Sequence, residues 1–169
     1  MYRAIRARGT AVLVFALLFT TAHAQTSSTD LLRWLLDYTN WSTDVLTVGT
    51  ALSSTYESQR SRSSDTVYFT ASALSADMRL RLSLASTTAE DLTNRYGPLM
   101  RSLPLTAENL YLVSAVNAGQ QSINFMRRPL LALGGSGVPA DEWESAFRDF
   151  AIYSELSALW RAMYDLFQR

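Results

Sequence analysis

Apolar residues recur at steps of three and four along four long segments, and this spacing limits the fold more than any other feature of the chain. Residues at that spacing lie on one face of an α-helix, so each segment predicts a helix with an apolar side. The four segments cover residues 30–56, 65–96, 106–128 and 139–169. Because short connections favour antiparallel neighbours, the sequence predicts an all-α fold, an antiparallel up-down-up-down four-helix bundle.

One stretch, MRLRLSLAS at residues 78–86, alternates apolar and polar residues as a half-buried strand does. Its surroundings favour a helix, because the neighbouring apolar residues gather in two opposite arcs when placed at about 100° per residue. One arc holds Val67, Ala71, Leu74, Met78, Leu82 and Ala85, and the other holds Phe69, Ala73, Leu80 and Leu84. We therefore expect a helix that is packed on two faces.

Caps and helix breakers mark the ends of the predicted helices. Hydroxyl residues suited to cap a first turn precede three segments: Ser28 or Thr29, Ser64, and Thr106. Gly97 and Pro98 are expected to end the second helix, and Pro129 to end or kink the third. Pro139 is expected at the first position of the fourth helix, where its missing N–H costs nothing.

The N-terminal residues have the layout of a secretory signal peptide. Arginines precede an apolar run over residues 11–19, and the small residues Ala22 and Ala24 follow it. Polar residues interrupt the run too early for the ~20 apolar residues of a spanning helix, although an uncleaved anchor is the alternative. The sequence predicts a signal peptide at residues 1–24, and a single domain at 25–169 in the periplasm or outside the cell.

The predicted mature chain lacks the side chains that most often perform catalysis. His23 is the one histidine of the sequence, and there is no cysteine and no lysine. Haem held by histidine, thiol or lysine nucleophiles and Ser-His-Asp triads are therefore excluded from that domain, and a zinc site would lack its usual ligands. Removing the three leader arginines leaves 12 basic against 15 acidic residues, which gives no electrostatic reason to bind nucleic acid.

Carboxylates remain as candidate acids and bases. Glu90 and Asp91 form one cluster, and Asp141, Glu142 and Glu144 form another, both placed near predicted helix ends. Acids at such ends usually serve capping and the helix dipole, so neither cluster identifies a catalytic site. We expect no cofactor and no metal ion.

Candidate binding residues lie on three of the predicted helices. Asn117, Gln121 and Asn124 form a polar stripe that is either a solvated face or a recognition surface. Gly119, on the apolar side of the same helix, either lets another helix approach closely or leaves room for a ligand. Aromatic residues that either fill the core or form an exposed patch are Trp34, Tyr38, Trp41, Trp160, Tyr164 and Phe167.

The last predicted helix has an unusually wide apolar arc. An aromatic row consists of Trp143, Ala146, Phe150, Tyr153, Ser157, Trp160, Tyr164 and Phe167. A parallel aliphatic row consists of Ile152, Leu156, Leu159, Met163 and Leu166. The sequence leaves open whether this arc is covered within one molecule or by a second copy.

These features favour an exported, non-enzymatic protein that acts by binding another protein or a second copy of itself, as an inhibitor, an immunity factor or a chaperone-like accessory. Missing catalytic residue types and abundant aromatics motivate this expectation. A carrier of an apolar small molecule in the bundle core is the first alternative. A carboxylate-based hydrolase is the second. No membrane span is expected after cleavage of the leader.

Overall fold

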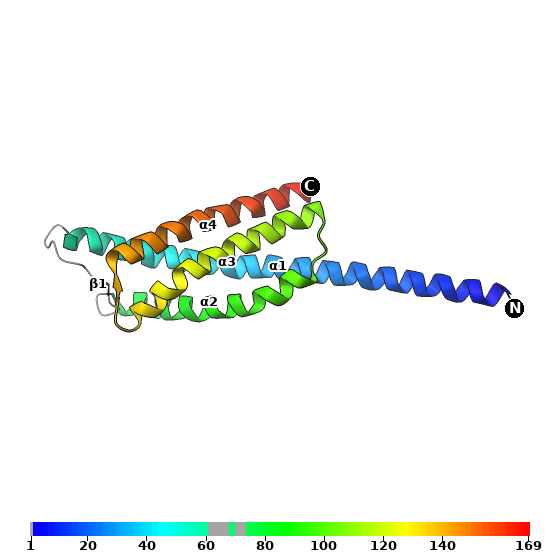
Figure 1. The fold of residues 1–169 in the computed structure, drawn as a ribbon, viewed down its shortest axis with the longest axis horizontal. Coiled ribbons are helices and arrows are strands. Elements are labelled where there is room, and N and C mark those ends of the chain that lie inside the picture. The colour runs from blue at the N-terminus through cyan, green and yellow to red at the C-terminus, as the bar shows by residue number, and fades with distance from the viewer. Residues whose placement is uncertain (1, 61–67, 70–73) are drawn as a thin grey trace.

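A computed structural model describes the backbone of residues 2–60, 68–69 and 74–169, and the side chains of residues 27–58 and 74–169. Its helices are α1 Tyr2–Arg60, α2 Ala76–Ser102, α3 Ala107–Leu133 and α4 Ala140–Phe167, with two short strands, β1 Tyr68–Phe69 and β2 Val138–Pro139. Successive helices run in opposite directions along one bundle (Figure 1). The predicted all-α four-helix bundle is confirmed.

The helices are not packed evenly against one another. The α3–α4 pair makes the most extensive contact, the α1–α2 pair comes next, and α1 touches α4 only sparsely. Strands β1 and β2 pair antiparallel, with Phe69 opposite Val138, and join the two connections at one end of the bundle. At the other end, α1 extends beyond its three neighbours toward the N-terminus (Figure 1).

The stretch that alternates like a strand is helical, since residues 78–86 lie within α2. Leu82 and Ala85 are buried against the rest of the bundle, whereas Leu80 and Leu84 are exposed. The prediction of two packed faces is therefore wrong for this part of the helix. The second apolar row of α2 faces outward because no other described helix covers it.

Several predicted helix boundaries differ from those of the structure. The first helix has no cap at Ser28 or Thr29, because α1 runs through both. Helix α2 begins at Ala76 and not at residue 65, since Phe69 lies in strand β1, and it continues past Pro98 to Ser102. Helix α3 continues past Pro129, which the sequence expected either to end or to kink it. In each case the turn after the proline contributes apolar side chains to the core, which offsets the lost backbone hydrogen bond. These side chains are Leu99 and Met100 in α2, and Leu130 and Leu133 in α3.

One of the predicted N-caps is confirmed, and the other helix starts differ from the prediction. Thr106 caps α3, and its hydroxyl accepts a hydrogen bond from the backbone N–H of Asn109 at 3.2 Å. Helix α2 begins at Ala76, with Ser75 as its N-cap, while the predicted cap at Ser64 lies outside the described residues. Pro139 directly precedes α4, one position before the expected one.

The signal peptide at residues 1–24 stays a prediction. Within the described part of the chain, no helix has an apolar stretch long enough to cross a membrane.

Two tryptophans of α1 attach this helix to α2. The indole N–H of Trp34 donates to the backbone carbonyl of Leu92 at 2.9 Å, and that of Trp41 donates to the carbonyl of Ala85 at 2.7 Å. Both the tryptophans and their acceptors are seven residues apart, two helical turns, so the bonds recur at one antiparallel register. A carbonyl oxygen has two lone pairs and can accept an indole besides its helical partner.

Two ion pairs flank these bonds on the surface. Arg81 contacts Asp44 at 3.1 Å, and Arg95 contacts Asp37 at 3.2 Å, again between α2 and α1. All four side chains are roughly 40% exposed, so each pair adds little to stability. The buried indole bonds therefore set the register, and the ion pairs agree with it.

We predict that Trp34→Phe and Trp41→Phe each lower the free energy of unfolding by about 1–3 kcal/mol more than Trp143→Phe does. All three tryptophans are buried, and all three changes remove the same atoms. Only at Trp34 and Trp41 does the change leave a carbonyl without its indole, since Trp143 Nε1 has no partner among the described residues. Urea denaturation followed by circular dichroism measures the difference, and equal losses at all three positions would contradict it.

Candidate functional site

The ten residues that the sequence nominated for binding do not converge on one site. Five are buried in the bundle core: Trp34, Tyr38, Trp41, Gly119 and Tyr164. Three lie exposed on α3: Asn117, Gln121 and Asn124. Two lie on the outer side of α4, where Trp160 is half-buried and Phe167 is exposed. Each group therefore has its own structural setting.

The α1 aromatics form the centre of the core. Trp34 and Tyr38 stack with ring centroids 5.5 Å apart and planes 7° apart, and the Trp41 ring meets Phe150 of α4 edge-on at 5.6 Å. A Cβ atom on Gly119 would lie 3.0 Å from the Trp34 ring. Gly119 thus allows these rings to approach the α3 backbone, and they occupy the space that a ligand would have needed.

The Tyr38 hydroxyl joins three helices. It is hydrogen-bonded to Ser122 Oγ of α3 at 2.6 Å and to Ser154 Oγ of α4 at 2.8 Å. The hydroxyl of Ser122 in turn donates to the Gly119 carbonyl at 2.7 Å. Burial raises the pKa of Tyr38, because the charged phenolate would be poorly solvated there. This network connects helices and is not open to substrate.

The polar stripe of α3 is exposed, and two of its residues bond to neighbours. Asn117 accepts a hydrogen bond from the Tyr96 hydroxyl of α2. The Asn124 side chain accepts from Gln120 Nε2, which also reaches Thr93 Oγ1 of α2 at 3.1 Å. The stripe therefore contributes hydrogen bonds between α2 and α3.

The two acidic clusters differ in position. Asp91 lies in the middle of α2, where it contacts Arg95 at 2.7 Å, so its predicted place near a helix end is wrong. Asp141 and Glu142 lie in the first turn of α4 as expected, and Glu142 pairs with Arg128 at 3.0 Å. Among the described residues, no group of three or more histidine, cysteine, aspartate or glutamate side chains is placed to hold a metal ion.

The outer face of α4 exposes a row of aliphatic side chains to solvent. We call the row Ile152, Leu156, Leu159, Met163 and Leu166 the α4 seam. Its isoleucine and leucines are between 36% and 67% exposed, and Met163 is half-buried. Their steps of four, three, four and three residues match the a and d positions of a coiled coil. The sequence predicted the row but not its exposure.

Aromatic pairs border the α4 seam on the α3 side. The ring of Tyr153 lies 5.4 Å from that of Phe125. Tyr111 of α3 contacts both Trp160 and Phe167, with ring centroids 5.9 and 5.1 Å away. These rings extend the apolar surface from α4 onto α3.

The α4 seam is uncovered because α4 packs against the bundle along one line of its surface. That line is Trp143, Phe150, Ser157 and Tyr164, spaced seven residues apart and buried. Ser157 brings the helices close, since its small hydroxyl donates to the Ala115 carbonyl of α3 at 2.8 Å. The seam lies on the side of α4 away from this line, where the sparse α1 contact gives no cover.

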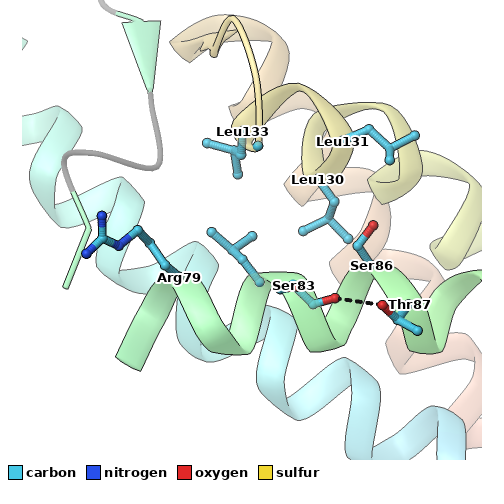
Figure 2. A pocket seen from close by; sticks show the side chains of 9 residues that line it. Arg79, Ser83, Ser86, Thr87, Leu130, Leu131 and Leu133 are labelled. Atoms are coloured by element: carbon cyan, nitrogen blue, oxygen red, sulfur yellow. Dashed lines mark hydrogen bonds between the residues drawn. The ribbon is translucent and has the colours of Figure 1, made fainter. Parts of the chain in front are cut away.

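A surface pocket of about 260 Å³ lies between α2 and the C-terminal end of α3. It is lined by Arg79, Leu82, Ser83, Ser86, Thr87, Leu130, Leu131, Leu133 and Gly134. Figure 2 shows leucines from α3 facing hydroxyls of α2, with Thr87 Oγ1 bonded to the Ser83 carbonyl at 3.1 Å. Sequence reasoning missed this pocket because its walls come from residues 79–87 of α2 and from residues 130–134 at the C-terminal end of α3, which the periodicity of a single helix does not bring together.

Sequence reasoning also missed a close contact at Gly49. A Cβ atom there would collide with the ring of Phe147, so the ring packs directly against the backbone of α1. An isolated glycine inside a helical pattern was the available signal.

No protein-family model, no curated protein and no solved structure matches the chain.

We predict that stability decreases at alkaline pH partly through Tyr38. Its folded pKa is raised above the value of about 10 in the unfolded chain, so its contribution is full below pH 10 and is lost as the pH rises through the folded pKa. Tyr38→Phe should lower the free energy of unfolding by about 1–2 kcal/mol at pH 7 and flatten the decrease above pH 10. Urea denaturation at several pH values tests this, and an unchanged alkaline slope would contradict it.

Proposed function

We propose that the chain is an exported, non-enzymatic protein that works by binding another protein chain through the α4 seam and its aromatic border. The observation that carries this proposal is the exposure of four aliphatic side chains of the seam at coiled-coil spacing. Roles as an inhibitor, an immunity factor or a chaperone-like accessory are all compatible with such a surface.

The physical support is the cost of leaving this surface in water. Burying apolar area contributes about 25 cal/mol per Å², and soluble monomers rarely expose contiguous apolar patches beyond a few hundred Å². Scattered exposed leucines need no explanation, but five apolar residues on one helical line, bordered by three aromatic rings, are a contiguous surface. A helix from a partner fits such a line, because its own apolar row can interlock with it.

The residue types of the surface favour binding over chemistry. Aliphatic and aromatic side chains lack nucleophilic or proton-transferring groups, and the predicted mature chain lacks histidine, cysteine and lysine. The half-buried Trp160 provides a large ring of the kind that often dominates the energy of an interface.

The test places a photo-reactive amino acid at Leu159 of the protein in its producing host. Irradiation should join position 159 to a partner chain, seen as one defined band of higher mass on a denaturing gel. Leu105 is the matched control, because it is an equally apolar and more exposed leucine outside the seam. Equal labelling at both positions, or none at 159, would reject the proposal.

A carrier of a small apolar molecule is a second candidate, favoured by the pocket between α2 and α3. Its leucines could surround an apolar group, and Arg79 at its edge could attract an anionic one. This pocket lies away from the core region near Gly119 where the sequence placed such a site.

We predict that the dye 1-anilinonaphthalene-8-sulfonate binds in this pocket if the carrier function is correct. Arg79→Gln should then weaken binding by about fivefold, because the sulfonate loses its cation. Arg101→Gln is the control, since it removes an arginine that does not line the pocket. Fluorescence titration measures both, and binding that is lost only with Leu159→Glu would place the dye on the α4 seam instead.

A further inference from the structure

We infer that the partner at the α4 seam is a second copy of the chain, paired antiparallel through α4 about a two-fold axis. This inference rests on the proposed function, because it names the occupant of the same surface. The main support for this inference is that the charges along the seam are self-complementary in an antiparallel pair.

The seam can interlock with itself. In an antiparallel pair of coiled-coil helices, each a position packs beside a d position of the other helix. Leu156 then lies beside Leu166 of the second copy, and Leu159 lies beside Met163. The two-fold symmetry repeats both contacts, so four layers of aliphatic side chains form without a polar residue among them.

The charges that flank the seam agree with the same register. Glu155 lies in α4 on the edge of the seam opposite the aromatic border, and Arg169 follows two residues after the end of α4 at Phe167, where continued helical spacing would place it on the same edge. Neither residue has an ion-pair partner among the described residues. In the register that forms the four layers, Glu155 lies opposite Arg169 of the second copy, once on each side of the axis. Each copy therefore supplies the charge that the other needs.

Other arrangements lose this agreement. Sliding the antiparallel pair by one heptad places Arg148 opposite Arg169 of the second copy, and like charges repel. A parallel pair places Glu155 opposite the uncharged Trp160, so no ion pair forms. The flanking charges thus select one orientation and one register.

The other edge of the seam is aromatic in both copies. In the same register, Trp160 lies near Trp160 of the second copy, and Tyr153 lies near Phe167. Their contacts with Tyr111 and Phe125 already hold these rings against α3, so less side-chain freedom is lost on association.

The first test is a charge exchange measured by analytical ultracentrifugation of the protein recovered from its host. The unmodified protein should be a dimer. Leu159→Glu should weaken dimerisation by at least about tenfold, whereas Leu105→Glu should leave it unchanged. Glu155→Arg and Arg169→Glu should each weaken it, and the double exchange should restore it, because the pair is then reversed in sign.

The second test locates the two-fold axis. Because the sequence has no cysteine, an introduced thiol is the only site at which a maleimide cross-linker can join two cysteines. Ala162→Cys places a thiol beside its own copy across the axis, so a short bismaleimide should join the two chains. Ala158→Cys is the control, because this exposed alanine lies one turn away and off the seam.

The outcomes separate the inference from the proposed function. A photo-cross-link at Leu159 of twice the chain mass, together with a dimer, supports both. A cross-link to a different protein, with a monomer in the ultracentrifuge, overturns the self-pairing and leaves the proposed function intact. Absence of any cross-link at Leu159, with a monomer, rejects both. If the protein is a dimer but the charge exchange does not change dimerisation and Ala162→Cys is not cross-linked, the proposed register of the two α4 helices is overturned.

Discussion

The fold depends first on two buried hydrogen bonds between α1 and α2. The indoles of Trp34 and Trp41 reach the carbonyls of Leu92 and Ala85, and a one-residue slip would break both bonds and leave buried donors unsatisfied. Because a buried N–H without a partner costs more than a weak contact gains, these bonds specify register in a way that apolar packing alone does not. They also point the indole rings inward, where Trp34 stacks on Tyr38 and rests on α3.

The position of α3 and α4 follows from that aromatic centre. Gly119 lets α3 approach Trp34, and the Tyr38 hydroxyl then reaches both remaining helices. The inner line of α4 is buried, with Ser157 against α3 and Phe150 against Trp41 of α1. The apolar residues on its other side have no role inside the described molecule. An exposed seam with interlocking spacing and unpaired flanking charges is the natural place for a second helix to bind.

Much of this architecture could be predicted from the sequence, and the errors have physical causes. Helical spacing identified α2 correctly despite the strand-like alternation, because a helix with two apolar rows produces the same pattern. The same spacing could not show that Leu80 and Leu84 stay exposed, since periodicity defines faces and not their neighbours. Pro98 was expected to end α2 and Pro129 to end or kink α3, but both helices continue, because burial of the following turns outweighs the local cost. The binding residues were nominated by type, and half of them proved to be core.

The sequence by itself determined the helical class, the directions of the chain and the chemistry that the predicted mature domain lacks, because these depend on local spacing and on residue type. Only the tertiary structure decided which apolar rows are buried. Both rows of α4 are largely apolar in sequence, yet Phe150 is enclosed and Leu159 is left in water. The reason is geometric, because a helix in a four-helix bundle turns only part of its circumference toward its neighbours. In α4 this part contains the small Ser157, whose hydroxyl donates to the Ala115 carbonyl of α3.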